Sequence, residues 1–167
     1  MERGKADATP LDGAAALAGK YLTFRLGQEE FGLPVLRVRE IIKMMSITQV
    51  PQVPPHVKGV INLRGKVIPV VDLRLKFGLE SSEYSERTCI IVVEVSTRGA
   101  RVMLGMVVDA VSEVVTLQAN ELETAPDFGA HIDLGYVSAM AKVKDSVKIL
   151  LDLDRVLGTD AAAALAA

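Results

Sequence analysis

The chain has 167 residues, of which 50% are hydrophobic, 4% aromatic and 24% charged, and its formal net charge is −2. This length predicts one domain, and the absence of Trp together with the many apolar residues predicts an aliphatic core. The near-neutral charge argues against nucleic-acid binding, which needs a basic surface and stacking aromatic side chains. No apolar run approaches the roughly 20 residues of a transmembrane helix, so we expect no direct membrane insertion.

Both ends of the chain are rich in small residues. Residues 1–19 carry charges throughout and lack the continuous apolar segment of a signal peptide. We expect them to form a flexible tail, and we take a cytoplasmic location as the default. Residues 159–167 (TDAAAALAA) are expected to form a second, Ala-rich tail that takes no part in the core. The folded domain is therefore expected to span residues 20–158.

The first segments in chain order predict a strand, a turn and a helix. Tyr21–Leu26 alternates apolar and polar residues, which is typical of a half-buried strand, and Phe31–Leu33 continues it after a polar turn at 27–30. In Val35–Ile42 the apolar residues recur at helical spacing, after a Pro that suits a first helical turn. This segment is therefore predicted to be a short amphipathic helix. The Pro-rich stretch 51–55 should follow as an extended loop.

A hairpin and a capped helix are predicted next. Val57–Leu63 and Val67–Val71 are the two strands of the hairpin, and Gly65 supplies the positive φ that such a turn commonly needs. Pro69 lacks an N–H for the sheet ladder, so we expect an edge strand or a bulge at this position. The segment Asp72–Gly78 predicts a short helix that Asp72 caps and Gly78 ends.

The second half of the chain repeats the first, after a polar surface connection at 80–87. Residues 31–78 match residues 104–158, and the order of Gly, apolar and Asp positions is the same in both segments. The displacement between matching residues is 73 at the start of the repeat and 80 further along the chain. Gly32 corresponds to Gly105 in this comparison. We therefore expect two similar subdomains, each a small curled antiparallel sheet with one or two short helices. Closing such a sheet into a barrel removes its exposed edges.

The reactive residues form no recognisable catalytic or metal-binding pattern. Cys89 is the only cysteine and opens an apolar strand, so it is interpreted as a small buried hydrophobic residue. His56 and His131 are each interpreted as lone surface histidines, because neither lies in a pattern that places it against a nucleophile. Gly59–Lys66 departs from the spacing of a phosphate-binding loop. We therefore expect no enzyme, no metal site and no cofactor.

The stretch Gly59–Arg74, GVINLRGKVIPVVDLR, is similar to the signature of the CheW-like chemotaxis coupling proteins. Phe31–Ile41 and Gly105–Val114 resemble the two corresponding strand–helix segments of that family. The resemblance implies a mostly β fold of two intertwined five-stranded SH3-like β-barrels with a few short helices. It also implies a non-catalytic adaptor that joins a CheA-type histidine kinase to the cytoplasmic tips of methyl-accepting chemoreceptors.

The resemblance further implies a receptor-binding surface in the groove between the two barrels. We expect Glu40 and Arg64 to face one another there, either as a pair within the fold or in contact with a partner. Arg37, Arg39 and Lys43 make the adjoining segment basic, and such charges tune the choice of partner more than affinity. The matching residues are Val35, Leu36, Val38, Glu40, Arg64 and Gly65.

The kinase is implied to bind through its regulatory domain, which has the same fold. Two barrel ends would then allow ring assembly by head-to-tail pairing of similar domains. Met44, Met45 and Ile47 are candidates for this contact, although we favour core packing for them. Two alternatives stay open: an adaptor of another chemosensory or twitching-motility pathway, and a small-ligand-binding β-barrel, which would need a pocket with converging polar groups.

Overall fold

The computed structural model of the chain describes residues 17–124 and 135–166, so His131 lies outside the described residues. Strands make up most of this part of the chain. They are β1 (Gly19–Leu26), β2 (Glu29–Pro34), β3 (Val38–Lys43), β4 (Val57–Leu63), β5 (Lys66–Asp72), β6 (Cys89–Thr97), β7 (Ala100–Val108), β8 (Ala110–Leu117), β9 (Leu122–Glu123), β10 (Val137–Val143) and β11 (Ser146–Leu151). The helical elements are η1 (Val35–Arg37), α2 (Leu73–Lys76), η2 (Ala119–Glu121) and α3 (Leu153–Ala166).

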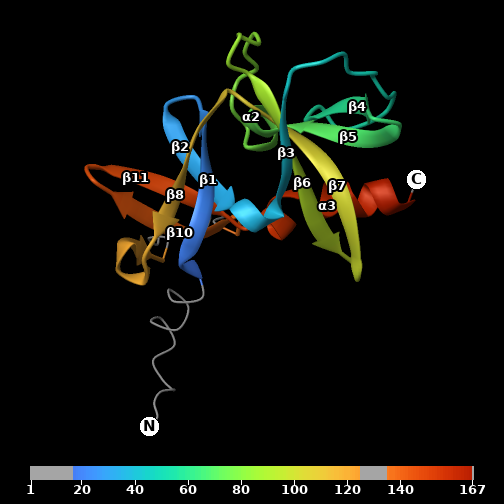
Figure 1. The fold of residues 1–167 in the computed structure, drawn as a ribbon. Coiled ribbons are helices and arrows are strands. Elements are labelled where there is room, and N and C mark those ends of the chain that lie inside the picture. Colours follow the sequence, from blue (N-terminus) through green and yellow to red (C-terminus); the bar gives the residue numbers. More distant parts are fainter. Residues whose placement is uncertain (1–16, 125–134, 167) are drawn as a thin grey trace.

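The strands form two sheets that exchange segments. Sheet A is six-stranded, in the order β8-β1-β2-β11-β10-β9, and sheet B is five-stranded, in the order β3-β6-β7-β5-β4. Each sheet therefore contains strands from both halves of the chain, which Figure 1 shows as blue strands beside orange ones and green strands beside yellow ones. A parallel pairing joins the halves in each sheet, β2 with β11 and β5 with β7. The mostly β fold with two intertwined units is confirmed, and β9 adds a sixth strand to one of them.

The repeated glycines lie at these two parallel pairings. Gly32 pairs with Leu150 and Gly105 pairs with Val70. A Cβ atom on Gly32 would lie 2.9 Å from Leu150 Cδ2, and one on Gly105 would lie 2.8 Å from Ile90 Cγ2. Both distances are too short for carbon atoms that pack at 3.5–4.0 Å. The repeated glycines thus lie at equivalent positions of the two parallel pairings, with the close contact across the joint in sheet A and with β6 in sheet B.

One core joins the two sheets. Its main cluster combines Phe24 and Leu33 of sheet A with Ile91 and Met106 of sheet B, and all four side chains are fully buried. The cluster also includes Val156 of α3. The aliphatic residues that dominate the sequence therefore hold the two sheets together.

The predicted helix at Val35–Ile42 is wrong. Only η1 is helical, and the chain then forms β3, an edge strand that pairs with β6 from Val38–Val93 to Lys43–Cys89. Side chains of β3 alternate between half-buried and exposed, as in a strand. A short run rich in Val and Ile satisfies both helical and strand spacing. The antiparallel partner β6, which is distant in the sequence, decides for the strand.

Pro69 also lies in an unexpected place. Its strand β5 is not an edge strand, because it lies between β7 and β4. The ladder between β5 and β7 begins only at Val70, so Pro69 precedes that ladder. The irregularity in pairing is in β4, between Val57 and Gly59. Pro69, which has no N–H, is therefore tolerated because it precedes the first residue of β5 that pairs with β7, and not because β5 is an edge strand.

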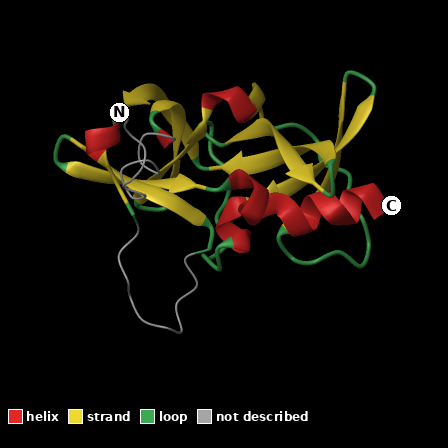
Figure 2. Ribbon diagram, turned by 90° about the horizontal axis from the view of Figure 1, so that it is seen from below, coloured by secondary structure: helices red, strands yellow, loops and turns green. Residues whose placement is uncertain are grey.

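The expectation that the C-terminal residues take no part in the core is also wrong. Helix α3 continues to Ala166 and lies across one face of the molecule (Figure 2). Ala161 is fully buried in the main core cluster, and the side chain of Asp160 is only 7% exposed. Alanine has the highest helix propensity, and burial of one helix face fixes the segment. Among the described residues, no helix is long and apolar enough to cross a membrane.

Candidate partner-binding site

The turn between β4 and β5 has the backbone geometry that its sequence predicts. Both central residues have positive φ, 50° at Arg64 and 88° at Gly65, as the tight turns of hairpins require. The backbone N–H of Gly65 donates to Asn62 Oδ1 at 2.8 Å. Asn62 and Gly65 therefore shape the turn, and the Arg64 side chain is left to extend from it.

Gly59, at the start of the same signature, allows the segment around Thr48 to pack directly against the backbone of β4. A Cβ atom at this position would lie 2.0 Å from the carbonyl oxygen of Thr48, so only glycine fits. Thr48 forms two backbone hydrogen bonds with Val60, of 2.8 and 2.9 Å. Met44 and Ile47 of this segment pack against a cluster of buried residues. The favoured core interpretation is confirmed for these two residues, while Met45 is 38% exposed.

The end of the signature caps a helix and connects the two sheets. Asp72 Oδ1 accepts hydrogen bonds from the backbone N–H groups of Arg74 and Leu75, at 2.9 and 3.4 Å, so the predicted N-cap is confirmed. Arg74 Nη1 donates to Asp109 Oδ2 at 2.5 Å, and the same oxygen accepts from the Gly27 backbone N–H at 2.8 Å. These signature residues have structural roles.

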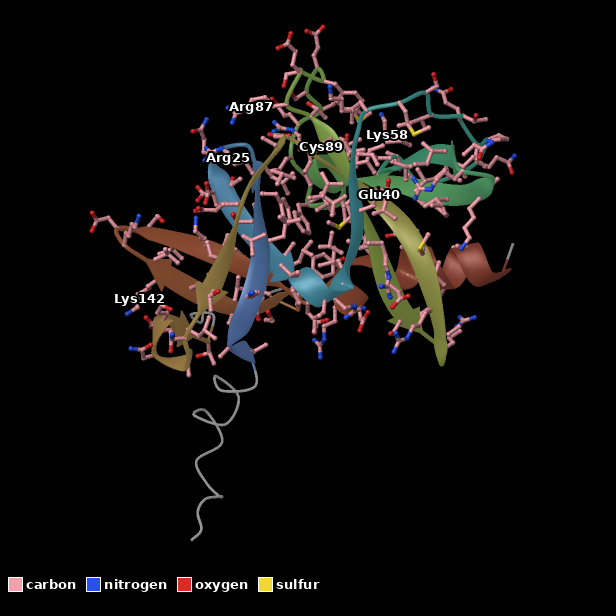
Figure 3. The ribbon with its side chains drawn as sticks, in the orientation of Figure 1. Arg25, Glu40, Lys58, Arg87, Cys89 and Lys142 are labelled. Carbon is pink, nitrogen blue, oxygen red and sulfur yellow. The ribbon has the colours of Figure 1, made fainter. Side chains whose placement is uncertain are left out.

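Arg64 is different, because its side chain supports neither the core nor the turn. It is 70% exposed and forms a bidentate ion pair with Glu40 of β3, in which Arg64 Nη1 donates to Oε2 at 3.0 Å and Nη2 to Oε1. The hydrogen bond from Arg64 holds the pKa of the Glu40 carboxyl below its usual value. The two residues therefore face one another as expected, and Figure 3 shows Glu40 on β3. Water screens such a surface pair, so it contributes little to stability.

The remaining predicted residues lie on the segment that carries Glu40. Leu36 is 88% exposed, whereas Val35 and Val38 are half-buried against the main core. This segment runs from η1 directly into β3. The Glu40–Arg64 pair brings the hairpin turn to it, so the predicted set lies on one connected strip of the surface. We call this strip, made of Val35, Leu36, Val38, Glu40, Arg64 and Gly65, the Arg64 surface.

Comparison with known proteins decides the family. Residues 20–161 match the model of the CheW-like domain. The chain belongs to the CheW-like domain family. It is 35% identical over 141 residues to Chemotaxis protein CheW of Klebsiella aerogenes, covering 84% of this chain and 82% of that protein. It is 32% identical over 139 residues to Chemotaxis protein CheW of Bacillus subtilis, covering 83% and 86%.

A solved structure agrees with this assignment. The scaffolding protein TtCheW from Thermoanaerobacter tengcongensis is similar with a TM-score of 0.74 and 37% identity, covering 84% of this chain and 93% of that chain. Family and fold class are thereby confirmed. Membership of a scaffolding family also agrees with the expectation that this CheW-like domain is not an enzyme.

The basic residues beside the Arg64 surface are largely neutralised within the CheW-like domain. Arg37 donates from Nε to the Glu94 carbonyl oxygen at 3.0 Å and forms an ion pair with Asp154 of α3. Arg39 Nη2 lies 2.6 Å from Glu94 Oε1. The sequence predicted that Arg37 and Arg39 make this segment basic, and this prediction is wrong for both arginines, because their charges are paired within the fold. Their acidic partners are distant in the sequence, so no local pattern could have revealed them.

His56 is not the lone surface histidine that the sequence suggested. Its Nε2 lies 2.7 Å from Asp160 Oδ1, and Lys76 Nζ donates to Asp160 Oδ2 at 3.1 Å. All three side chains are at most 19% exposed. Cys89 is half-buried, and burial raises the pKa of its thiol. In the described part of the CheW-like domain, no group of three metal-ligating side chains is placed to hold an ion.

Two pairs of exposed apolar residues occupy equivalent positions in the repeat, and sequence reasoning missed them. Ile41 on β3 and Val114 on β8 are 45% and 55% exposed and are displaced by the 73 residues of the repeat. Val67 and Val147, in the two hairpins, are 70% and 52% exposed and are displaced by 80 residues. We call the two members in the first half, Ile41 on β3 and Val67 on β5, the β3 patch, and their counterparts, Val114 on β8 and Val147 on β11, the β8 patch.

Proposed function

We propose that this protein is a chemotaxis adaptor that couples the cytoplasmic tips of methyl-accepting chemoreceptors to a CheA-type histidine kinase. It acts in the cytoplasm by protein–protein binding. Membership of the CheW-like domain family supports the proposal, as do relatives named Chemotaxis protein CheW that the chain matches over most of its length. The Arg64 surface is proposed to bind the receptor.

The exposed position of Arg64 is the observation that carries this proposal. The other signature residues described above shape a turn, admit a neighbouring segment or cap a helix. Arg64 does none of these, yet Glu40 holds its guanidinium in one orientation. A planar guanidinium that is oriented in advance loses less entropy on binding, and Arg is common at the energetic centres of interfaces. Leu36, which is 88% exposed, offers an apolar anchor on the same strip.

Replacement of Arg64 by Ala is expected to reduce receptor binding about tenfold or more, because an oriented cation at an interface commonly contributes over 1 kcal/mol. Glu40→Ala should weaken binding less, since Arg64 would remain but would lose its orientation. The measurement is the affinity of the purified variants for a soluble receptor tip fragment. Arg101→Ala is the matched control, because Arg101 is 72% exposed and is also paired with an acidic residue, Glu94.

The charge-reversed variant Glu40→Arg/Arg64→Glu separates the two roles of the pair. It keeps an ion pair within the fold and reverses the charge offered to a partner. Receptor binding should stay lost in this variant if Arg64 contacts the receptor. Unchanged receptor binding by Arg64→Ala and Glu40→Ala would show that the Arg64 surface does not bind the receptor. Failure of the wild-type protein to support kinase stimulation, in a mixture of receptor and CheA-type kinase, would overturn the adaptor function itself.

The β3 and β8 patches support a second part of the proposal, that same-fold domains bind at both ends of this protein. Singly exposed apolar side chains are ordinary on protein surfaces. Here, however, the exposed β-branched residues recur at equivalent positions of both halves. A kinase regulatory domain of the same fold would find similar surfaces at each end, which is the geometry of head-to-tail rings.

Val67→Glu is expected to weaken binding of the isolated kinase regulatory domain about tenfold, because a carboxylate would be buried unpaired in an apolar contact. Val147→Glu should weaken assembly of larger species in the same way while leaving the other contact intact. Affinity by calorimetry and particle size by light scattering measure the two effects. Val50→Glu is the control, since Val50 is 38% exposed and the residue displaced from it by 73 positions is Glu123, which is not apolar. Equal behaviour of all three variants would exclude both patches.

A further inference from the structure

Four of the six aromatic side chains that the structure describes lie next to one another. The sequence has only four Phe, three Tyr and no Trp. Phe24, Phe31, Phe77 and Tyr136 nevertheless form a continuous ladder, with ring centroids 5.8–5.9 Å apart at each step. Phe24 is fully buried, and the other three rings are partly exposed. The ladder therefore runs from the core to the surface.

The outer rings of the ladder line a groove between sheet A and the α2 region. The groove has a volume of about 590 Å³, which is within the range of ligand sites. The β1–β2 turn forms one wall and the α2 region another, and Figure 1 shows these two elements beside each other. Ile149 and Leu151 of β11 add apolar surface. We call this the aromatic groove, and it shares no residue with the Arg64 surface, the β3 patch or the β8 patch.

Charged side chains at the aromatic groove leave it with excess negative charge. Arg74 is neutralised by Asp109 at 2.5 Å, and Lys76 by Asp160 at 3.1 Å. Glu29 and Glu80 also line the groove and are exposed, and within the described residues neither carboxylate has an ionic partner. Two free carboxylates thus lie beside three aromatic rings. This combination is complementary to a cation with a planar or apolar body.

The ladder ends at Tyr136, whose side chain is partly exposed. The ring centroid of Phe77 lies 5.8 Å from that of Tyr136 at a tilt of 38°, and no further ring in the described residues stacks on Tyr136. A guanidinium stacks on an aromatic face while its N–H groups pair with carboxylates. We propose that the aromatic groove binds an arginine side chain presented by an apolar peptide segment of a partner protein. Tyr136 provides the stacking face, and Glu29 and Glu80 provide the acceptors.

The simpler role of the ladder is to hold the two sheets together. That role explains Phe24 and Phe31, which connect the core to the groove. It does not explain two unpaired carboxylates beside exposed rings, because a purely structural contact gains nothing from them. The proposal is independent of receptor and kinase binding, since it uses a different surface.

The test is a titration of the full-length protein with N-acetyl-Phe-Arg-amide, followed by NMR chemical shifts of backbone amides. The citrulline analogue, N-acetyl-Phe-citrulline-amide, is the matched neutral probe. We expect saturable shifts at Gln28, Phe77 and Val137, with Kd of the order of 1 mM for such a small ligand. The citrulline peptide should bind at least tenfold more weakly, because it lacks the charge that the carboxylates recognise.

The variant Glu29→Gln/Glu80→Gln should lose at least fivefold in affinity for the arginine peptide, and Tyr136→Leu should lose a similar factor. Glu86→Gln is the control, because Glu86 is an exposed carboxylate that does not line the groove. Equal binding of the arginine and citrulline peptides would overturn the proposal, as would shifts that do not saturate. Shifts confined to the Arg64 surface would overturn it equally.

Discussion

Deletion of residues 159–167 is expected to lower the free energy of unfolding by about 3–5 kcal/mol, the usual cost of stranding one partner of a buried ion pair. Asp160 is lost in this deletion, and its carboxylate joins His56 to Lys76. The side chain of Lys76 is only 10% exposed and would remain without its anion. Ala161, fully buried in the main core, is lost as well.

This loss is large compared with the total stability of a typical domain, about 5–15 kcal/mol. Thermal unfolding of the shortened chain should shift down by roughly 10 °C or more. A chain that ends at Ala161 is the matched control, because it keeps Asp160 and removes only the last residues of α3. Asp160→Ala in the full chain should reproduce most of the effect. Equal unfolding temperatures for the full chain and the chain ending at 158 would show that the C-terminal residues are dispensable.

The second large effect is expected at Glu30 and Lys148, which form an ion pair at the parallel joint of sheet A. The Lys148 side chain is 6% exposed and that of Glu30 is 24% exposed. In sheet B, the equivalent positions under the repeat are Met103 and Ile68, which belong to an apolar cluster. One half of the protein thus has an ion pair where the other half has two apolar side chains.

The two single substitutions should differ in cost. Glu30→Met leaves the buried Lys148 ammonium without an anion, so we expect a loss of about 3 kcal/mol. Lys148→Ile should cost less, because Glu30 is more exposed and still lies 3.4 Å from Arg25 Nη1 and 3.4 Å from Ser112 Oγ. The double variant, which copies the apolar pair of sheet B, should unfold within about 1 kcal/mol of the wild type. Urea denaturation of the four proteins gives the coupling energy directly. Additive losses in the double variant would contradict this account.

Acid unfolding provides an independent check on the same pair. The hydrogen bond from Lys148 holds the pKa of the Glu30 carboxyl below its ordinary value of 4.5. Ionised Glu30 therefore contributes stability above about pH 4.5, and this contribution is lost as the pH falls through the lower folded-state pKa. The double variant has no such group at this position. It should consequently lose less stability than the wild type on acidification, and an identical acid profile would exclude the contribution.

Local rules were sufficient for the elements that depend on neighbouring residues. The β4–β5 hairpin follows from Gly65 at its turn and from apolar residues on both sides. Asp72 caps α2 as its position before a short helical run predicted. Gly32 and Gly105 marked the repeat, and both lie at the parallel joints between the halves, where an added Cβ atom would come within 2.9 Å of a neighbouring side chain. These features are encoded over a few residues or recur in order along the chain.

The candidate site was predictable only in part. The resemblance to the family identified Arg64 and Glu40, and the structure pairs them. The sequence did not reveal that Leu36 would be the most exposed apolar residue of that strip, or that Arg37 and Arg39 would be neutralised. The partners of these arginines come from α3 and β6, which only the folded chain brings near.

By itself the sequence determined an aliphatic, aromatic-poor β domain with two similar halves and few reactive side chains. The tertiary structure decided that residues 35–42 are mainly a strand, because β6 pairs with them. It decided that the Ala-rich C-terminus is part of the core, because burial of Ala161 and pairing of Asp160 fix it there. It also placed Phe31, Phe77 and Tyr136 in one groove. Each of these outcomes depends on contacts between distant segments, whose energies no local pattern contains.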